Sequence, residues 1–276
     1  MTSTDPIDPV AFRAFEHAGW QRAAEHYPDA FGSLTSQTIA SLLDAVRLEP
    51  GIKLLDVASG PGFVAAAAAE RGAIVVGVDF SPAMVDYARR RHPTLTFMEG
   101  DAEKLPLPDR NFDAVVMNFG LLHLARPEAA VSEAFRVLRT GGRYSFTVWA
   151  KPEVAAGFGI VLRAIETHGT IDVGLPIGPA FFRFSDPDEC RRCLLEAGFD
   201  HVEVRELPLA WRLGSADSLF DAMSRGAVRT TALLYGQTPE NLSAIREAIR
   251  TTVRQYARGD SIVVPMGAVI ASAIKS

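Results

Sequence analysis

Three aspartates and a glycine pair carry the clearest chemical signal in this sequence of 276 residues. The glycines, Gly60 and Gly62, lie in the segment LLDVASGPGF, where a predicted strand turns into a predicted helix. Glycine lets a backbone approach a ligand closely, and the free N–H groups of the helix that follows point at that ligand. Asp56 ends the first predicted strand, Asp79 ends the second, and Asp101 follows the third. The pattern predicts a ligand site at the strand ends.

The charges distinguish this site from a dinucleotide site, which uses the same glycine turn. Asp56 would repel a pyrophosphate, whereas its carboxylate suits a cationic amino group. Asp79 can accept both hydroxyl groups of a ribose, and Asp101 can accept a hydrogen bond from an adenine amino group. Ala65 stands where a dinucleotide fingerprint prefers its third glycine. We therefore expect a ligand with an amino acid end, a ribose and an adenine, and a nicotinamide dehydrogenase is the less favoured alternative.

Four segments resemble the class I S-adenosylmethionine-dependent methyltransferases, and most of all the subgroup related to ubiquinone and menaquinone biosynthesis. They are DVASGPG, VVGVDFSPAMVDYAR, GDAEKLPLPDRNFDAVVMNFGLLHL and RVLRTGGRYSFTVW. In order and spacing they cover residues 50–150, and LLEAGFDHVEV further along resembles the family's late helix-strand unit. The resemblance implies S-adenosylmethionine as the cofactor and S-adenosylhomocysteine as the product.

The resemblance also implies a set of cofactor-binding residues. Those that it suggests are Tyr27, Asp56, Ala58, Gly60, Gly62, Asp79, Phe80, Met84, Asp101, Ala102, Asn118 and Phe119. Phe80 and Met84 would flank the adenine, and the Ala102 backbone would read its edge together with Asp101. Asn118 or Phe119 would lie near the sulfonium. The spacing of Phe80 and Met84 is equally typical of helix residues that face a core.

The methionine part of the cofactor would be surrounded by Asp56, Ala58 and Gly60. Tyr27 lies in the N-terminal segment EHYPDAFGSLT, and it is expected to close over the cofactor's carboxylate end.

His123 is the candidate catalytic residue. It follows the fourth predicted strand, at the edge where doubly wound sheets bind ligands, and its ordinary pKa near neutrality suits a general base. The alternative is a packing or hydrogen-bonding role, because a histidine here is common in the resembling family whatever the substrate. The sequence contains no GxSxG elbow and no cluster of metal ligands, so neither a hydrolase nor a metal site is predicted.

The two cysteines, Cys190 and Cys193, stand three apart in a predicted helix. Two thiolates without a nearby histidine are half a zinc site, so partly buried thiols are the favoured interpretation.

Alternating strands and helices must position these residues. Continuous apolar runs predict strands at residues 52–57, 73–79, 95–98, 112–118 and 143–149. Helical patterns at 65–71, 82–91 and 127–138 separate them, followed by a helix at 188–196, a strand at 202–207 and a helical region at 215–258. We predict a doubly wound, Rossmann-like α/β fold with helical lid inserts. The resemblance implies seven strands, mostly parallel, whose last strand (262–274) inserts antiparallel beside the fifth.

The whole chain, residues 1–276, is expected to be a single methyltransferase domain. Its parts would be an N-terminal helical cap at 1–46, a cofactor-binding core at 50–150, and substrate-lid inserts at 151–184 and 213–260. Aromatic residues of the inserts are candidates for the walls of an acceptor site. These are Phe158, Phe181, Phe182, Phe184 and Trp211. The same residues could equally pack the inserts against the sheet.

The expected function is methyl transfer to a small, fairly apolar acceptor, in which a nucleophilic O, N, C or S atom attacks the sulfonium methyl in line. The alternative is a methyltransferase-fold protein that binds the cofactor in a scaffold or non-methylating role. The formal charge of −5 argues against a nucleic-acid partner.

The first residues, MTSTDPIDPV, do not resemble a signal peptide, and no apolar stretch approaches the roughly 20 residues of a membrane span. Together with the low cysteine content, this predicts a cytoplasmic protein. A homodimer is an assembly that the sequence allows.

Overall fold

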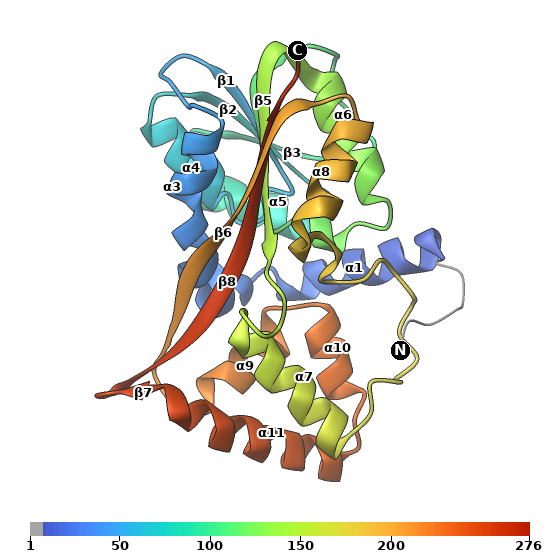
Figure 1. The fold of residues 1–276 in the computed structure, drawn as a ribbon, viewed down its shortest axis with the longest axis vertical. Helices are drawn as coiled ribbons and strands as arrows, with labels where there is room; N and C mark the ends of the chain where they lie inside the picture. The colour runs from blue at the N-terminus through green and yellow to red at the C-terminus, as the bar shows by residue number, and fades with distance from the viewer. Residues whose placement is uncertain (1–7) are drawn as a thin grey trace.

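The computed structural model describes residues 8–276 and shows a central sheet with helices on both sides (Figure 1). The strand order is β3-β2-β1-β4-β5-β8-β6, and the short β7 pairs with β8. The strands are β1 (Lys53–Val57), β2 (Ile74–Asp79), β3 (Thr96–Glu99), β4 (Phe112–Asn118), β5 (Leu138–Trp149), β6 (Asp200–Leu213), β7 (Ala257–Arg258) and β8 (Ser261–Ile274). β8 runs antiparallel between β5 and β6, which confirms the predicted position of the last strand. The predicted doubly wound, mostly parallel sheet is confirmed.

Local sequence explains why the core strands and helices form where they do. β1 and β4 are almost wholly buried, as expected of parallel strands that are covered on both faces. α5 (Pro82–Arg91) starts at Ser81, whose Oγ accepts a hydrogen bond from the Met84 N–H at 3.3 Å, and Pro82 occupies the first helical position. Both β4 and α5 span the residues that the sequence predicted.

Further helices cover the two faces of the sheet. α3 (Ile39–Ala45) and α4 (Phe63–Glu70) lie together on one side, and α6 (Pro127–Val137) and α8 (Pro187–Glu196) lie together on the other (Figure 1). The sheet is therefore shielded from solvent on both faces.

β5 and β6 are longer than predicted. β5 begins at Leu138, which pairs with Phe112 of β4, and the next pair joins Ala114 to Arg143. Residues 139–142 of β5, which include the glycine pair at 141–142, therefore form a bulge between the two pairs. β6 continues past Pro208, a residue that argues against a strand interior, because β6 is the edge strand of the sheet. The Gln37 side chain donates to the Ala210 carbonyl at 2.9 Å and accepts from its N–H at 3.1 Å, and so covers this edge.

The helices of the two inserts gather beyond the carboxyl ends of the strands, at the lower end of Figure 1. They are α7 (Ala156–His168), α9 (Ser218–Arg225), α10 (Arg229–Tyr235), α11 (Pro239–Val253) and the turn η5 (Arg254–Tyr256). The short turn η4 (Arg183–Ser185) instead packs against α8, β5 and β8. α7 and α9 both pack against α11. The two inserts, far apart in the sequence, thus form one layer.

The N-terminal segment runs between this layer and the sheet. Its elements are α1 (Pro9–Ala23), the π-helical turn η1 (Pro28–Gly32), α2 (Ser33–Thr35) and η2 (Ser36–Thr38), which lead into α3. The helical cap is therefore interrupted at Pro28–Gly32 by one wide turn. The part of the cap and of the targeting prediction that falls on residues 1–7 lies outside the described residues.

Candidate active site

A cavity of about 840 Å³ opens where β1, β2 and β4 end. Its lining contains every predicted cofactor-binding residue except Gly62, and it also contains the candidate base His123. The lining residues that the sequence did not single out are Trp20, Thr35, Ser59, Pro61, Phe63, Val64, Gly100, Gly120 and Leu124. Gly62 instead caps α4 at a φ of 83°, and a Cβ there would lie 2.7 Å from the Phe97 ring. The predicted residues, except Gly62, therefore line one cavity. Gly62 forms part of the turn that leads into α4.

The backbone is strained at this edge of the sheet. Ala58 follows β1 with a φ of 54°, and Phe119 follows β4 with a φ of 55°. Non-glycine residues seldom adopt this left-handed region, and such residues concentrate at functional sites. Phe119 also stacks on Trp149, with ring centroids 4.0 Å apart.

Asp79 is buried at the end of β2. Its Oδ2 accepts a hydrogen bond from the Gly60 N–H at 2.8 Å, and its Oδ1 accepts one from the Ser81 N–H at 2.9 Å. Burial raises the pKa of this carboxyl to about 6, against the lowering effect of the two backbone hydrogen bonds. Asp79 is therefore mostly ionised at neutral pH and joins the glycine turn to the start of α5.

Asp56, at the end of β1, is less well satisfied. Its Oδ2 accepts from the Ala65 N–H at 3.0 Å, but its Oδ1 is buried and has no partner among residues 8–276. Burial raises the pKa of this carboxyl to about 8, and the neighbouring Asp79 adds to the rise. An unsatisfied buried oxygen on the cavity wall is suited to a cationic group that enters the cavity.

Asp101 lines the cavity, but its carboxylate already has partners. Arg13 on α1 donates to Oδ2 from Nε at 2.9 Å, and the Glu103 N–H donates to Oδ1 at 2.9 Å. The sequence had assigned this carboxylate to an adenine amino group and had no signal for Arg13. The ion pair ties α1 to the loop after β3.

The two residues expected to flank an adenine are placed differently. Phe80 is half-buried and faces the His17 ring, 5.3 Å away between centroids. Met84 is 2% exposed and belongs to the core as well as to the cavity wall. The sequence also allowed both residues to be core residues that do not bind an adenine. That interpretation agrees better with Met84 than with Phe80.

Asn118 is anchored by hydroxyl groups at the end of β4. Its Oδ1 accepts from Thr38 Oγ1 at 2.8 Å and from Thr147 Oγ1 at 2.6 Å, while its Nδ2 donates to the Thr35 carbonyl at 3.2 Å. The amide orientation is thus set by its surroundings. Tyr27 donates to Thr35 Oγ1 at 3.3 Å, and burial raises the pKa of its phenol to about 12.

A second cavity of about 410 Å³ shares Trp20, Tyr27, Phe119 and His123 with the first. The rest of its lining is mostly aromatic or comes from the loop before α10. These residues are Phe31, Trp149, Phe158, Phe181, Gly226, Ala227, Val228, Arg229 and Thr230. The two cavities therefore meet at a common wall.

Of the five predicted wall residues, only Phe158 and Phe181 line this second cavity. Phe182 packs edge-to-face against both of them, with ring centroids 5.9 Å from Phe158 and 4.9 Å from Phe181. Phe184 and Trp211 are core residues, 3% and 2% exposed, and Trp211 packs on Phe31 with centroids 4.8 Å apart. Phe184 and Trp211 therefore follow the alternative of packing in the core, because aromatic content alone does not say which side chains border a cavity.

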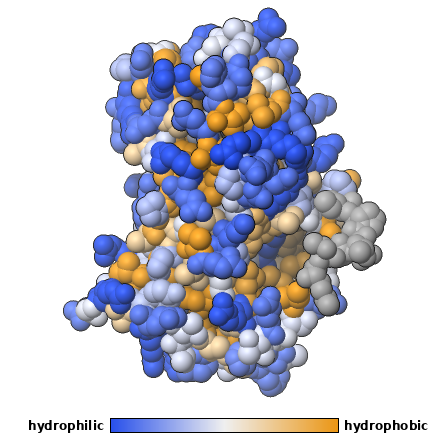
Figure 2. Space-filling model, viewed as in Figure 1, coloured by the Kyte–Doolittle hydropathy of each residue, from blue (hydrophilic) through white to orange (hydrophobic). Residues whose placement is uncertain are grey.

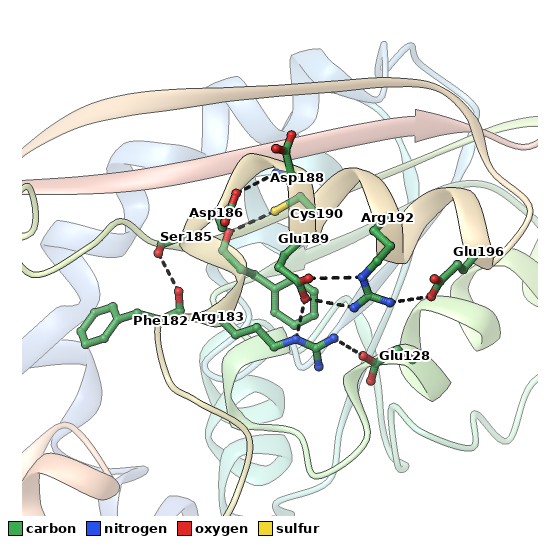
Figure 3. Close-up of polar contacts among 11 residues, drawn as sticks. Glu128, Phe182, Arg183, Ser185, Asp186, Asp188, Glu189, Cys190, Arg192 and Glu196 are labelled. Atoms are coloured by element: carbon green, nitrogen blue, oxygen red, sulfur yellow. Dashed lines mark hydrogen bonds and ion pairs between the residues drawn. The ribbon is translucent and has the colours of Figure 1, made fainter. Parts of the chain in front are cut away.

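The loop that carries Phe181 is fixed by ion pairs (Figure 3). Arg183, two residues on, contacts Glu128 of α6 and donates from Nε to Glu189 of α8 at 2.8 Å. Arg192 also pairs with Glu189 and extends the network along α8. The wall of the second cavity is therefore attached to the helices that cover the sheet.

His123, in the turn η3 (Leu121–His123), lines both cavities, and its ring contacts a buried carboxylate. Its Nδ1 is 3.0 Å from Oε2 of Glu16, a residue of α1 that is fully buried. Arg229 donates from Nε to the other oxygen of Glu16 at 2.9 Å. Neither Glu16 nor Arg229 could be predicted as a partner of His123 from a local pattern, because each lies far from His123 in the chain.

The two cysteines are free and buried in α8, which confirms the prediction of helical thiols. Burial raises the pKa of each thiol to about 12. Across the described part of the chain, no group of three or more His, Cys, Asp or Glu is placed to hold a metal ion.

The exterior combines polar and apolar residues. On the face shown in Figure 2, hydrophobic residues form patches that hydrophilic side chains interrupt. None of the helices within residues 8–276 is long and apolar enough to cross a membrane.

The chain is similar in sequence to known methyltransferases. Residues 55–146 match a family model described as a methyltransferase domain. The chain is 44% identical over 121 residues to a demethylmenaquinone methyltransferase of Beutenbergia cavernae, covering 42% of this chain and 50% of that protein. It is 31% identical over 175 residues to a demethylmenaquinone methyltransferase of Paenarthrobacter aurescens, covering 60% of this chain and 69% of that protein. The chain thus spans about half the length of the first relative.

Among solved structures, the fold is similar to that of phosphoethanolamine N-methyltransferase 2 of Haemonchus contortus in complex with S-adenosylhomocysteine. The TM-score is 0.59 at 20% identity, and the match covers 97% of this chain and 61% of that one. At this identity the likeness concerns the fold.

Proposed function

The chain belongs to the class I S-adenosylmethionine-dependent methyltransferases of the ubiquinone and menaquinone type, and we propose that it transfers a methyl group to a small, apolar, quinone-like acceptor. The observation that carries the proposal is the pair of adjoining cavities. One is lined by the strand-end carboxylates, the other is largely aromatic, and both contain Phe119 and His123.

We propose that the larger cavity binds S-adenosylmethionine, the cofactor of this family, because its lining contains the three strand-end aspartates. The unpartnered Oδ1 of Asp56 would accept a hydrogen bond from the cationic amino group, which satisfies a buried oxygen that otherwise has none. Asp79 would hold the ribose hydroxyl groups with the lone pairs that Gly60 and Ser81 leave free. When bound, the cofactor supplies an electrophilic methyl group on a sulfonium sulfur.

The remaining cofactor contacts follow the lining of the cavity. We propose that Phe80, Met84 and the Ala102 backbone surround the adenine, with Asp101 behind them in its pair with Arg13. Tyr27 would cover the carboxylate end. Ala58, Asn118 and Phe119 would border the methionine part, and Gly62 is omitted from the set because it does not line the cavity.

The smaller cavity would hold the acceptor. Aromatic side chains favour a flat, apolar ring, and the relatives are named for demethylmenaquinone, so we propose a quinone-like ring. The ring would have to be reduced to a quinol to carry hydroxyl groups. His123 would act as the general base and remove a hydroxyl proton from that ring, a role that its place on both cavity walls supports. The inserts at 151–184 and 213–260 and the cap at 1–46 would exclude water as parts of one methyltransferase domain.

We also propose that the protein is cytoplasmic and acts on a small molecule and not on nucleic acid. The formal charge of −5 and the two free, buried cysteines support this. A homodimer stays a hypothesis, which sedimentation velocity tests.

Methyl transfer is tested with the full chain, cofactor labelled in the methyl group, and 1,4-naphthoquinone kept reduced under anaerobic conditions. The expected result is label in the extracted naphthol fraction, abolished when the naphthoquinone is left oxidised. Cofactor binding by calorimetry without transfer to this or to a benzoquinol would instead support the non-methylating alternative.

A further inference from the structure

The carboxylate of Glu16 is a buried charge that the proposed cofactor site does not use. Glu16 is fully buried on α1, and each of its oxygens has one partner from a distant part of the chain. Oε2 lies 3.0 Å from His123 Nδ1, and Oε1 accepts from Arg229 Nε at 2.9 Å. Three segments that are separate in sequence, namely α1, η3 and α10, therefore meet at one carboxylate.

Glu16 is ionised at neutral pH. Burial alone would raise the pKa of this carboxyl. The charge of His123 when its ring is protonated, the charge of Arg229 and the hydrogen bonds of both outweigh burial and hold the pKa below its ordinary value. A buried carboxylate is stable only when its lone pairs are matched in this way. Removing either partner would leave the charge poorly compensated.

Arg229 is itself fixed on all sides. Its Nη1 donates to the Pro179 carbonyl at 2.9 Å, and its Nη2 donates to the Leu122 carbonyl at 3.0 Å. Its guanidinium also lies over the Phe12 and Phe181 rings, 4.5 and 5.4 Å from their centroids. Three hydrogen bonds and two aromatic rings thus hold the guanidinium in one orientation. Because Arg229 donates to Glu16, the carboxylate is held in one orientation as well.

This arrangement decides which nitrogen of His123 carries the proton. A neutral imidazole has one N–H, and an ionised carboxylate can only accept. Nδ1 must therefore be the donor to Glu16, and Nε2 keeps its lone pair. Nε2 has no hydrogen-bond partner among residues 8–276 and is not shut off from solvent, and the ring lines both cavities.

We propose that Glu16 is a positioning residue that locks His123 in the Nδ1–H tautomer and presents the Nε2 lone pair to the acceptor, with Arg229 as its anchor. The inference rests on the proposed function for its purpose, since Nε2 would take the hydroxyl proton of the acceptor. The electron pair of that O–H bond stays on the acceptor oxygen. The imidazolium then keeps its Nδ1–H bond to Glu16 and returns the Nε2 proton to water.

The tautomer can be measured without any acceptor. In the full chain with ¹⁵N-labelled histidine, the ring nitrogen and proton shifts distinguish the Nδ1–H from the Nε2–H tautomer. His123→Gln identifies the signals of His123 among the six histidines. The wild type is expected in the Nδ1–H form at a pH where the ring is neutral, and Glu16→Gln is expected to shift the population toward Nε2–H. A wild type in the Nε2–H form, or an unchanged Nδ1–H form in Glu16→Gln, overturns the proposal.

Kinetics provide the second readout. With reduced 1,4-naphthoquinone as the probe, Glu16→Gln should lower the single-turnover rate by about tenfold or more, a part of the roughly 10²–10⁴-fold that a positioned base contributes. The dissociation constant of S-adenosylmethionine and the KM of the probe should change less than about twofold. Equal losses in cofactor binding and rate would show a merely structural role and overturn the assignment.

Glu133→Gln is the matched control, because it removes a part-buried carboxylate that pairs with Arg136 and does not touch His123. It should leave the tautomer and the rate unchanged. If the wild type does not methylate the probe at all, the proposed function fails, whereas the tautomer measurement still decides the role of Glu16.

Discussion

Asp79 and Asp56 stand side by side at the cavity edge, but they have different partners. Asp79 receives backbone N–H groups on both oxygens, whereas one oxygen of Asp56 receives none. The pKa values of about 6 for Asp79 and about 8 for Asp56 follow from the same contrast, since hydrogen bonds to the ionised form offset burial more fully at Asp79. The Asp79 carboxylate is thus held in place by two backbone N–H groups. The unpartnered oxygen of Asp56 is free to accept a hydrogen bond from a cationic group.

Asp79→Asn should weaken S-adenosylmethionine binding by about tenfold or more. An amide keeps the size of the side chain but turns one acceptor into a donor that faces a backbone N–H, a loss worth about 1–3 kcal/mol. Calorimetry on the folded variant measures the change. Asp113→Asn, which removes a carboxylate paired with Arg139 away from the cavity, is the control and should bind normally. Unchanged binding in Asp79→Asn would remove this residue from the site.

Cofactor binding near pH 7 should release protons. Asp56, with a pKa of about 8, is mostly protonated in the free protein, and a cationic amino group beside it favours the carboxylate. Up to about one proton per cofactor should leave the protein, seen as a binding enthalpy that differs between phosphate and Tris buffers. Asp56→Asn should abolish the difference. Equal enthalpies for the wild type in both buffers would show that Asp56 does not ionise on binding.

At the scale of elements, the sequence predicts where strands end better than it predicts which side chains from other segments pack opposite those ends. β4 and α5 match because apolar periodicity, Ser81 and Pro82 act locally. The ends of β1, β2 and β4 then locate most of the cavity lining, since parallel strands end at one edge. Glu16 and Arg229 could not be found in this way, because their meeting depends on how helices pack and not on any local pattern.

The turn between β1 and α4 holds two left-handed glycines with different surroundings. A Cβ on Gly60, at a φ of 49°, would meet nothing within 4 Å, whereas one on Gly62, at a φ of 83°, would lie 2.7 Å from Phe97. Gly60→Val should therefore abolish cofactor binding with near-native circular dichroism, since its side chain strains the turn and enters the cavity.

Gly62→Ala is the matched comparison for Gly60→Val. It should lower the melting temperature through the clash with Phe97, and the folded fraction should retain cofactor affinity within a few-fold. The reverse pattern, with affinity lost only in Gly62→Ala, would contradict this division of roles.

At the scale of the whole molecule, the cavities exist only because the N-terminal segment and both inserts close over the sheet edge. Trp20, Phe158 and Ala227 come from three such segments and line one cavity. Their apolar character was visible in the sequence, but Trp211, of the same character, faces the core. Composition predicts that aromatic side chains will be buried, whereas long-range packing decides whether they border a cavity.

The buried carboxylates give the ligand-free protein a particular dependence of stability on pH. The folded-state pKa values of Asp56 and Asp79, about 8 and about 6, lie above the ordinary unfolded value near 3.9. For a raised pKa, the stabilising contribution is complete below the unfolded value and is lost as the pH rises through the folded value. The free energy of unfolding should therefore fall between about pH 4 and about pH 8 on account of these two groups.

The measurement is the melting temperature of the wild type minus that of the Asp56→Asn, Asp79→Asn double variant, taken from pH 5 to pH 8.5. His92, whose pKa burial lowers, acts in the opposite sense but is present in both proteins, so the difference removes it. The difference should decline as the pH rises, by about 2–4 °C for each kcal/mol lost. Saturating S-adenosylmethionine should raise the wild-type melting temperature more at pH 8 than at pH 5, because a cation then meets an ionised Asp56. A difference that stays flat or rises with pH would mean that these carboxylates are not buried as the fold places them.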